Sequence, residues 1–189
     1  MMKKAWIFLI IFVFLIFVGV AWYISGLNRV VRMDEEANEA WAQIDTQLKR
    51  RSELIPNMVA TAKGYMKHER KVFTHIADAR AALAGAKTIP AKIKAAAKLD
   101  SALGRLLVIV ERYPDLKANQ TFIRLMDELA GTENRIAVAR VRYNRAVKGF
   151  NAHVREVFGR FFAKKRSLDE QRTYFEVGEE EAEAPRVEF

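Results

Sequence analysis

Apolar residues run without interruption near the start of the chain. Residues 5–24 read AWIFLIIFVFLIFVGVAWYI, and none of these twenty residues is charged. A helix of this length is about 30 Å long, which matches the hydrocarbon thickness of a bilayer. Trp6 lies near one end, and Trp22 and Tyr23 lie near the other, where aromatic side chains favour the membrane interfaces. The pattern predicts a transmembrane helix inside an N-terminal membrane anchor, residues 1–27.

A cleaved signal peptide is the alternative interpretation of this segment. The small residues Gly19 and Ala21 would allow cleavage before Trp22. The apolar run is longer than the ~7–15 residues of a signal-peptide core, which favours the anchor. Basic residues flank both ends, so the positive-inside rule separates the two orientations only slightly. We expect a single-pass protein of the cell membrane, with the N-terminus in the cytoplasm and the following domain outside.

From residue 28 to about residue 84, apolar residues recur with a period of 3.5. Such a heptad seam predicts one long helix that packs lengthwise on partner helices. Pro56 lies inside the seam, but the heptad phase continues unchanged through it, so we expect a kink and not a break. The two series of seam positions are Val30, Ala37, Ile44, Arg51, Met58, Tyr65, Val72, Ala79 and Asp34, Trp41, Leu48, Ile55, Ala62, Glu69, Ile76, Leu83.

Two further helices follow. Thr88 and Pro90 are typical of a helix start, and the apolar positions of this second helix, 90–112, continue to its end. Pro114 ends the helix, and Asp115 can cap the third one, predicted over about 116–158. The seam of the third helix is Asn119, Phe122, Met126, Leu129, Glu133, Ile136, Arg140, Tyr143, Val147, Phe150, Val154, Val157 and Phe161.

These elements define a fold class and a domain organisation. No strand-like alternation occurs in residues 28–162, so we predict an all-α protein: an N-terminal transmembrane helix followed by an elongated antiparallel helical bundle. The bundle has three long helices, or four if Pro56 breaks the first. It should occupy residues 28–162, and residues 163–189 should form an irregular, acidic C-terminal tail. The stretch from 169 to 189 holds eight acidic and two basic residues.

The net charge of the chain indicates which classes of partner it could bind. The formal net charge is +9 overall and +13 within residues 28–168. A body this basic attracts anionic lipid headgroups, or nucleic acid where it is present. Runs of charge usually mark solvated helix faces, so we expect no specific nucleic-acid partner.

The sequence holds little catalytic chemistry. The absence of cysteine excludes disulfides, thiol nucleophiles and cysteine-ligated metal centres. His68 and His75 are seven residues apart, about 10.5 Å along a helix, which is too far to share one metal ion. Motifs of serine hydrolases, dinucleotide-binding proteins and P-loop enzymes do not occur. We therefore expect neither catalysis nor a cofactor.

Polar residues interrupt the seam of the third helix. Glu133 and Arg140 fall on apolar positions, and buried charges need partners, for which Arg51, Asp34 and Glu69 are the candidates. Such a network can set the register of a bundle or bind a small ligand. Because no pocket-forming glycine or loop accompanies it, the structural role is favoured. The candidate network comprises Glu133, Asn134, Arg140, Tyr143, Asn144 and Asn151.

Four stretches resemble the LemA family of membrane proteins. They are AWAQIDTQLKRRSELIPNMV (40–59), KGYMKHE (63–69), ERYPDLKANQTFIRLMDELAGTENRIAVARVRYNRAVKGFN (111–151) and YFE (174–176). The resemblance implies an antiparallel helical bundle on a single-pass anchor. It also implies an external N-terminus, opposite to the orientation that the flanking charges favour. The family commonly has Phe-Pro after the last long helix, where this chain has Phe158-Gly159.

Two functions fit these features. The first is a membrane-anchored helical scaffold or adaptor of the LemA type. It would contact the lipid bilayer through residues 5–24 and bind an unidentified membrane or envelope protein, or a second copy of itself. The alternative is a binder of anionic surfaces, lipid headgroups or nucleic acid, through the basic bundle. Basic residues gathered on one face would favour the alternative, whereas scatter over all faces would favour the scaffold.

Overall fold

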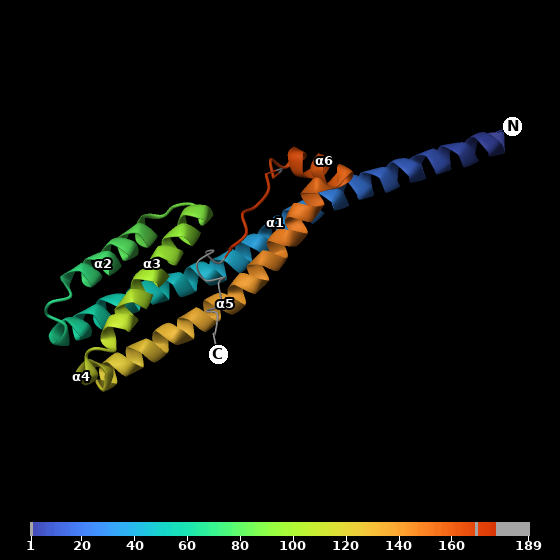
Figure 1. Ribbon diagram of the computed structural model, residues 1–189. Coiled ribbons are helices and arrows are strands. Elements are labelled where there is room, and N and C mark those ends of the chain that lie inside the picture. Colours follow the sequence, from blue (N-terminus) through green and yellow to red (C-terminus); the bar gives the residue numbers. More distant parts are fainter. Residues whose placement is uncertain (1, 169, 177–189) are drawn as a thin grey trace, which may run out of the picture. The chain divides into compact units, whose positions relative to one another are not determined.

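The computed structural model of the chain describes residues 2–168 and 170–176. These residues form no strand, so the predicted all-α class is confirmed. The helices of the described part, labelled in Figure 1, are α1 (Met2–Tyr65), α2 (Arg70–Gly85), α3 (Ile89–Val110), α4 (Pro114–Lys117), α5 (Gln120–Arg155) and α6 (Val157–Lys165).

One uninterrupted helix, α1, carries both the apolar span and the first seam. A window of mean hydropathy 3.0 lies in its first part, and none of that window is buried. By length and composition, α1 is the one helix of the described residues that could cross a membrane. Further along α1 the predicted seam residues are buried, namely Val30, Ala37, Trp41, Ile44, Leu48, Arg51, Ile55, Met58 and Ala62.

Pro56 lies inside α1 and does not end it. Proline has no backbone N–H, so the carbonyl of Ser52 has no partner within the helix at this point. Arg80 of α2 supplies the missing donor, because its Nε donates to the Ser52 oxygen at 2.9 Å. The prediction that the helix continues through Pro56 is confirmed, and the alternative of a break there is wrong.

The prediction of one helix over 28–84 is wrong, because the chain turns between Tyr65 and Arg70. α1 ends at Tyr65, residues 66–69 form a turn, and α2 begins at Arg70. The seam of α2 then resumes at Ile76 in the same heptad phase, and Met66 is buried within the turn. Heptad periodicity indicates which face of a helix is buried, but it does not indicate the direction of the chain. A turn that reverses the chain and keeps the heptad phase is therefore not visible in the apolar pattern. Tyr65, expected on the seam, is exposed.

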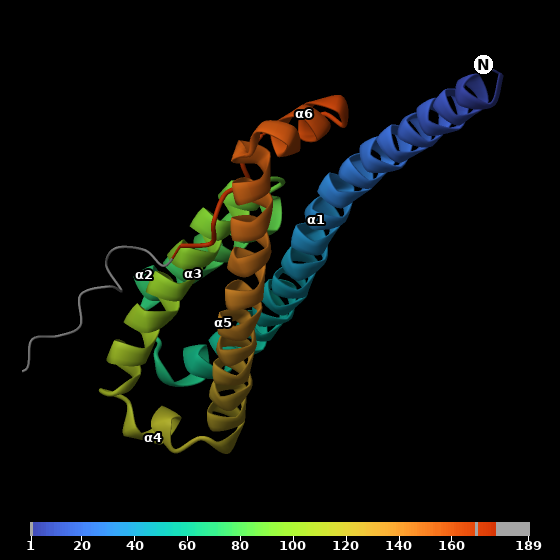
Figure 2. The same ribbon diagram turned by 90° about the vertical axis from the view of Figure 1, so that its right-hand side faces the viewer.

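Among the described residues, one compact unit comprises residues 40–144 and 173–176. Within it, the second part of α1, α2, α3 and the first part of α5 lie side by side with alternating directions (Figures 1 and 2). Short turns and the corner helix α4 connect them. Their inward faces form the core, whose largest fully buried side chains include Ile44, Ile55, Met58, Met66, Ile76, Leu99, Leu106, Leu116 and Tyr143.

Helix starts agree only in part with the prediction. α3 begins beside Thr88, whose hydroxyl accepts from the Ala91 backbone N–H at 3.3 Å, and this cap is confirmed. The predicted helix over 116–158 is instead divided into α4, α5 and α6. Asp115 lies in the first turn of α4, whereas α5 is capped by Asn119, whose Oδ1 accepts from the Phe122 N–H at 2.9 Å. Asp115 as the cap of the long helix is therefore wrong.

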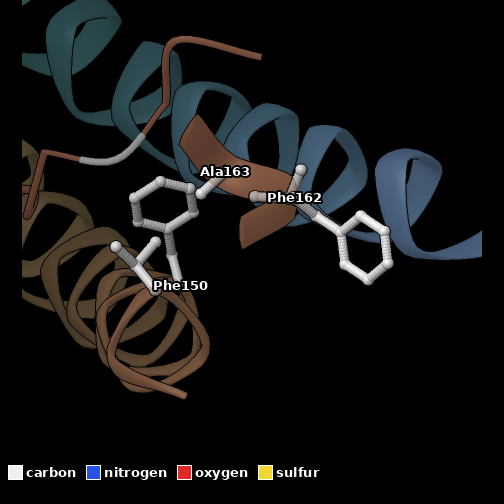
Figure 3. Close-up of a cluster of buried hydrophobic side chains, with 5 residues drawn as sticks. Phe150, Phe162 and Ala163 are labelled. Carbon is white, nitrogen blue, oxygen red and sulfur yellow. The ribbon is translucent and has the colours of Figure 1, made fainter. Parts of the chain in front are cut away.

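The other compact unit comprises residues 1–39 and 145–172. Here α5 ends at Arg155 and the chain bends at Glu156 into α6. Phe162 and Ala163 of α6 form a buried cluster with Val30, Phe150 and Val154, and Figure 3 shows Phe150 of α5 reaching towards Ala163.

The bend at Glu156 corrects the end of the predicted third seam. Because α6 leaves the axis of α5, Val157 and Phe161 are exposed and Phe162 is buried in their place. Residues 163–165 still belong to α6, and only 166–168 and 170–176 are irregular as predicted for the tail. The remainder of the predicted tail, residues 177–189, lies outside the described residues. The boundaries 1–27, 28–162 and 163–189 stay a prediction.

Candidate functional site

Arg51 is the centre of a charged cluster inside the bundle. It projects from α1, and only 8% of its surface is exposed. Its Nη1 lies 2.6 Å from Asp100 Oδ1 of α3 and 2.5 Å from Glu133 Oε2 of α5. Glu133 is thus paired with one of the candidate partners that the sequence suggested. A cation held by two carboxylates from different helices favours one register of the three helices over others.

A small cavity adjoins this charged cluster. Its volume is about 190 Å³, and Arg51 and Glu133 belong to its lining. The rest of the lining is apolar and comes from α1, α3 and α5, namely Met58, Leu103, Leu106, Leu107, Met126, Leu129 and Ala130. A cavity of this size and lining has room for a few carbon atoms, and its two charged lining residues, Arg51 and Glu133, are paired with each other.

Asn134 and Arg140 do not join Glu133 in a network. Asn134 is exposed and lines a groove between α1 and α5 together with Gln47 and Val138. Arg140 is only partly buried, and its guanidinium lies 5.9 Å from the centre of the Phe175 ring. The expectation that Arg140 pairs with a carboxylate is wrong within residues 2–168 and 170–176, where the aromatic ring takes that place.

Tyr143 and Asn144 hold the segment that follows the helices. The Tyr143 hydroxyl donates to the Thr173 carbonyl at 2.8 Å. The Asn144 side chain both accepts from the Phe175 N–H at 2.8 Å and donates to the Phe175 carbonyl at 2.9 Å. An amide that pairs with both backbone groups of one residue reproduces the hydrogen bonding of a neighbouring strand. The Phe175 ring packs 6.3 Å from the Trp41 ring.

The second unit repeats this pairing with Asn151. Its side chain donates to the Arg172 carbonyl at 2.9 Å and accepts from the Arg172 N–H at 2.8 Å. The Arg172 guanidinium in turn lies 2.6 Å from Asp34 Oδ1 and 2.8 Å from Asn38 Oδ1 of α1. Asp34, a candidate partner of the seam charges, is therefore paired with Arg172.

Glu69 binds the corner between α3 and α4 and not the third-helix charges. Its Oε1 lies 3.1 Å from the Arg112 guanidinium and accepts from the Tyr113 hydroxyl at 3.2 Å. Burial raises the pKa of the Tyr113 hydroxyl above its ordinary value, and the bond to Glu69 raises it further. Both contacts fix the chain reversals at this end of the bundle.

The histidines do not converge. His68 and His75 are exposed, whereas His153 is buried with its Nδ1 2.9 Å from Glu156 Oε2. Within the described ranges, no three His, Asp or Glu residues lie close enough together to hold a metal ion. Of the six residues of the predicted network, Glu133 thus belongs to the charged cluster and Asn134 to an exposed groove. The other four contact residues 172–175, namely Arg140, Tyr143, Asn144 and Asn151.

Two of these interactions had no clear signal in the sequence. Arg172 stands among acidic residues and gave no sign of its contact with Asp34 on the first helix. The string YFE contains Phe175 but did not indicate that Trp41 and Asn144 would bind it. Asparagines seven residues apart on one helix face, Asn144 and Asn151, were the available clue.

Comparison with known proteins now identifies the family. The sequence profile of the LemA family matches residues 40–189, which is most of the chain. The chain belongs to the LemA family. This LemA-family chain is 27% identical over 166 residues to the protein LemA of Metamycoplasma hominis. The aligned region covers 85% of the chain and 75% of that relative.

Two magnetosome proteins are also similar to this LemA-family chain. MamQ 2 of Paramagnetospirillum magneticum is 24% identical over 164 residues, which covers 71% of the chain and 59% of the relative. MamQ of Magnetospirillum gryphiswaldense is 26% identical over 153 residues, which covers 67% and 56% respectively. The chain therefore spans less than two thirds of either magnetosome relative. These relatives and the exposed apolar start of α1 are consistent with a membrane protein.

Proposed function

We propose that this LemA-family protein is a membrane-anchored scaffold without catalytic activity. In this proposal residues 5–24 cross the lipid bilayer and the bundle binds a membrane or envelope protein. The observation that carries the proposal is the continuity of α1, whose fully exposed apolar part leads without a break into the buried seam of the bundle. The anchor and the binding domain thus share one helix.

The groove between α1 and α5 is the surface that best supports partner binding. Its volume is about 510 Å³, and Val138 in its lining is more than half exposed. The other lining residues are Ala139, four uncharged polar residues and two arginines, namely Gln43, Thr46, Gln47, Asn134, Arg135 and Arg142. The buried Oε1 of Gln47, in the same lining, has no hydrogen-bond partner within the described residues. An exposed apolar side chain such as Val138 in a groove of this size is typical of a protein contact, which would cover it.

Scattered charge favours the scaffold over the anionic-surface alternative for the bundle as a whole. Exposed Lys and Arg side chains occur on every helix from α1 to α6. A nucleic-acid or lipid site would gather them along one face. The basic bundle is therefore not the binding surface of the proposal, and no specific nucleic acid is expected.

Site-specific photo-crosslinking in native membranes tests the proposal. A benzophenone amino acid replaces Val138 in the groove, and Ala81, an exposed residue of α2 that lines no groove, serves as the control. We expect one defined adduct with another membrane or envelope protein from position 138 and none from position 81. Equal labelling from both positions, or no adduct from 138, would contradict partner binding; an adduct with a second copy would convert the proposal to self-assembly.

The orientation of the anchor needs its own measurement. We propose an external bundle with the N-terminus in the cytoplasm, from the flanking charges. The chain has no cysteine, so Glu35→Cys on α1 introduces a single thiol beyond the apolar span. An external bundle predicts reaction with a membrane-impermeant maleimide in intact cells. Reaction only after lysis would place the bundle inside, and loss of residues 1–21 from the mature protein would show a cleaved signal peptide.

A further inference from the structure

The short helix α6 exposes large apolar side chains that the bundle does not cover. Val157, Phe158 and Phe161 are 82%, 63% and 47% exposed, although each is apolar. The opposite side of the same helix is buried, with Gly159, Phe162 and Ala163 packed inward. Such a pattern indicates that the outer side of α6 contacts something other than water.

Close packing fixes which side of α6 points outward. A Cβ added to Gly159 would lie 1.9 Å from the backbone oxygen of His153, so only glycine allows this approach. A Cβ added to Gly26 of α1 would lie 2.3 Å from the Phe162 ring. Gly159 therefore lets α6 approach the end of α5 closely, and Gly26 of α1 leaves room for the Phe162 ring of α6, so rotation of α6 about its axis would create clashes.

The exposed rings lie beside the end of the apolar span. The Phe158 ring packs edge-on against Trp22 at 5.4 Å between centroids, and the Phe161 ring lies 6.4 Å from Tyr23. Trp22 and Tyr23 are the last aromatic residues of the span and belong to the belt that marks a membrane interface. If residues 5–24 cross the bilayer, Phe158 and Phe161 are at interfacial depth.

The charge of α6 has the sign that a membrane surface attracts. Arg160, Lys164, Lys165 and Arg166 are exposed, and residues 157–168 contain no acidic residue. Anionic headgroups attract clustered basic side chains near the interface, and the long stems of lysine and arginine let the charges reach the phosphates. A second copy of α6 is a poor occupant, because a two-fold contact would bring the two basic clusters together.

We propose that α6 is an interfacial helix that lies on the bilayer beside the anchor. Val157, Phe158 and Phe161 insert at the boundary of headgroups and acyl chains, and the four basic residues bind anionic lipid headgroups. The inference rests on the proposed anchor, and it adds a second, lipid-specific contact. This contact fixes the end of α5 at the membrane surface.

Spin labels on the full-length protein in lipid nanodiscs test the proposal. Because the chain has no cysteine, Leu15→Cys, Glu35→Cys and Val157→Cys each give one labelling site, in the span, beyond it and on α6. Oxygen concentrates in the bilayer and nickel complexes stay in water, so the ratio of the two collision rates reports depth. We expect a ratio at 157 several-fold above that at 35 and approaching that at 15.

The three positions separate the possible failures. A water-like ratio at both 15 and 157 overturns the anchor itself. A membrane-like ratio at 15 with a ratio at 157 equal to that at 35 overturns only the interfacial helix. Dipolar broadening between labels at 157 would show a second copy on this surface and also overturns the proposal.

Lipid composition tests the charge component. We expect the ratio at 157 to rise when phosphatidylglycerol replaces phosphatidylcholine, and this rise to disappear in Lys164→Gln/Lys165→Gln. Arg145→Gln/Lys148→Gln removes the same charge from exposed positions of α5 and is the matched control, in which the rise should persist. An equal loss of the rise in both double variants would show general electrostatics and overturn the specific role of α6.

Discussion

Arg51 and Arg140 are both charged residues on apolar seam positions, but their surroundings differ. Arg51 is buried and held by two carboxylates from two other helices. Arg140 is partly exposed and rests on an aromatic ring. The first arrangement links three helices through charge, whereas the second covers the side of a docked phenylalanine. Their contributions to stability should therefore differ in size.

Substitution of each arginine by methionine tests this difference. Arg51→Met removes the cation that Asp100 and Glu133 share, and we expect a loss of about 1–3 kcal/mol in the free energy of unfolding. Arg140→Met removes a partly exposed cation–π contact, for a loss below about 1 kcal/mol. Denaturant titration of the full chain in detergent micelles, followed by circular dichroism, measures both.

A further variant separates register from simple stability. If the cluster is structural, replacing Arg51, Asp100 and Glu133 together by apolar residues should recover much of the loss, because the two carboxylates are then removed together with their shared cation. A loss from Arg140→Met equal to that from Arg51→Met would contradict the assignment of the two roles.

At the scale of single helices, α1 lacks one intrahelical hydrogen bond, and a neighbouring helix replaces it. Pro56 removes one intrahelical hydrogen bond, and Arg80 of α2 donates to the freed Ser52 carbonyl. The repair comes from a neighbouring helix, so it also ties α2 to α1 at this level. Proline is tolerated within long helices where another group satisfies the exposed carbonyl.

A double-mutant cycle between Pro56 and Arg80 measures this repair. In the natural background, Arg80→Met should cost about 1 kcal/mol, because the Ser52 carbonyl loses its donor. In a Pro56→Ala background the N–H of the new alanine bonds to Ser52, so Arg80→Met should cost close to nothing. Unfolding titrations of the four proteins give the coupling energy, which we expect to be about 0.5–1.5 kcal/mol. Strictly additive effects would show that Arg80 does not replace the missing bond.

Heptad periodicity predicted the buried faces of these helices and missed their ends. Val30, Trp41, Ile55 and Ile76 are buried as expected, because a seam depends only on the local spacing of apolar residues. The turn at 66–69 depends instead on contacts with distant residues, such as Glu69 with Arg112, and the bend at Glu156 depends on the close approach of Gly159 to the His153 backbone. Local spacing does not encode these contacts.

The sequence predicted which polar residues of the candidate site are satisfied, but it did not predict their partners. Polar residues on or beside a buried seam must be satisfied, and Glu133, Tyr143, Asn144 and Asn151 all are. Their partners include backbone groups of Arg172, Thr173 and Phe175, and backbone groups carry no sequence signal. The Trp41–Tyr143 contact, with ring centroids 5.4 Å apart, was accessible because both residues lie on predicted facing seams.

At the scale of the whole molecule, the segment 171–176 is held without regular structure of its own. Side chains of α5 supply its hydrogen bonds, and Trp41 and Arg140 cover the Phe175 ring. A segment held in this way can detach while the helices stay folded, because it is not part of any core helix. Its stability is therefore local, and global unfolding need not report it.

Phe175→Ala should open this segment and leave the bundle intact. The ring is 9% exposed, and its burial is worth about 1.5–3 kcal/mol, which corresponds to a roughly ten- to hundred-fold increase in opening. Hydrogen exchange should therefore accelerate by that factor at the amide of residue 175, which donates to Asn144, while the amides of α5 and the melting temperature stay unchanged. Tyr174→Ala, at the partly exposed neighbouring position, is the control and should have a much smaller effect. If the melting temperature falls with Phe175→Ala and exchange rises equally throughout α5, the segment is part of the cooperative core, because its loss then unfolds the helices as well.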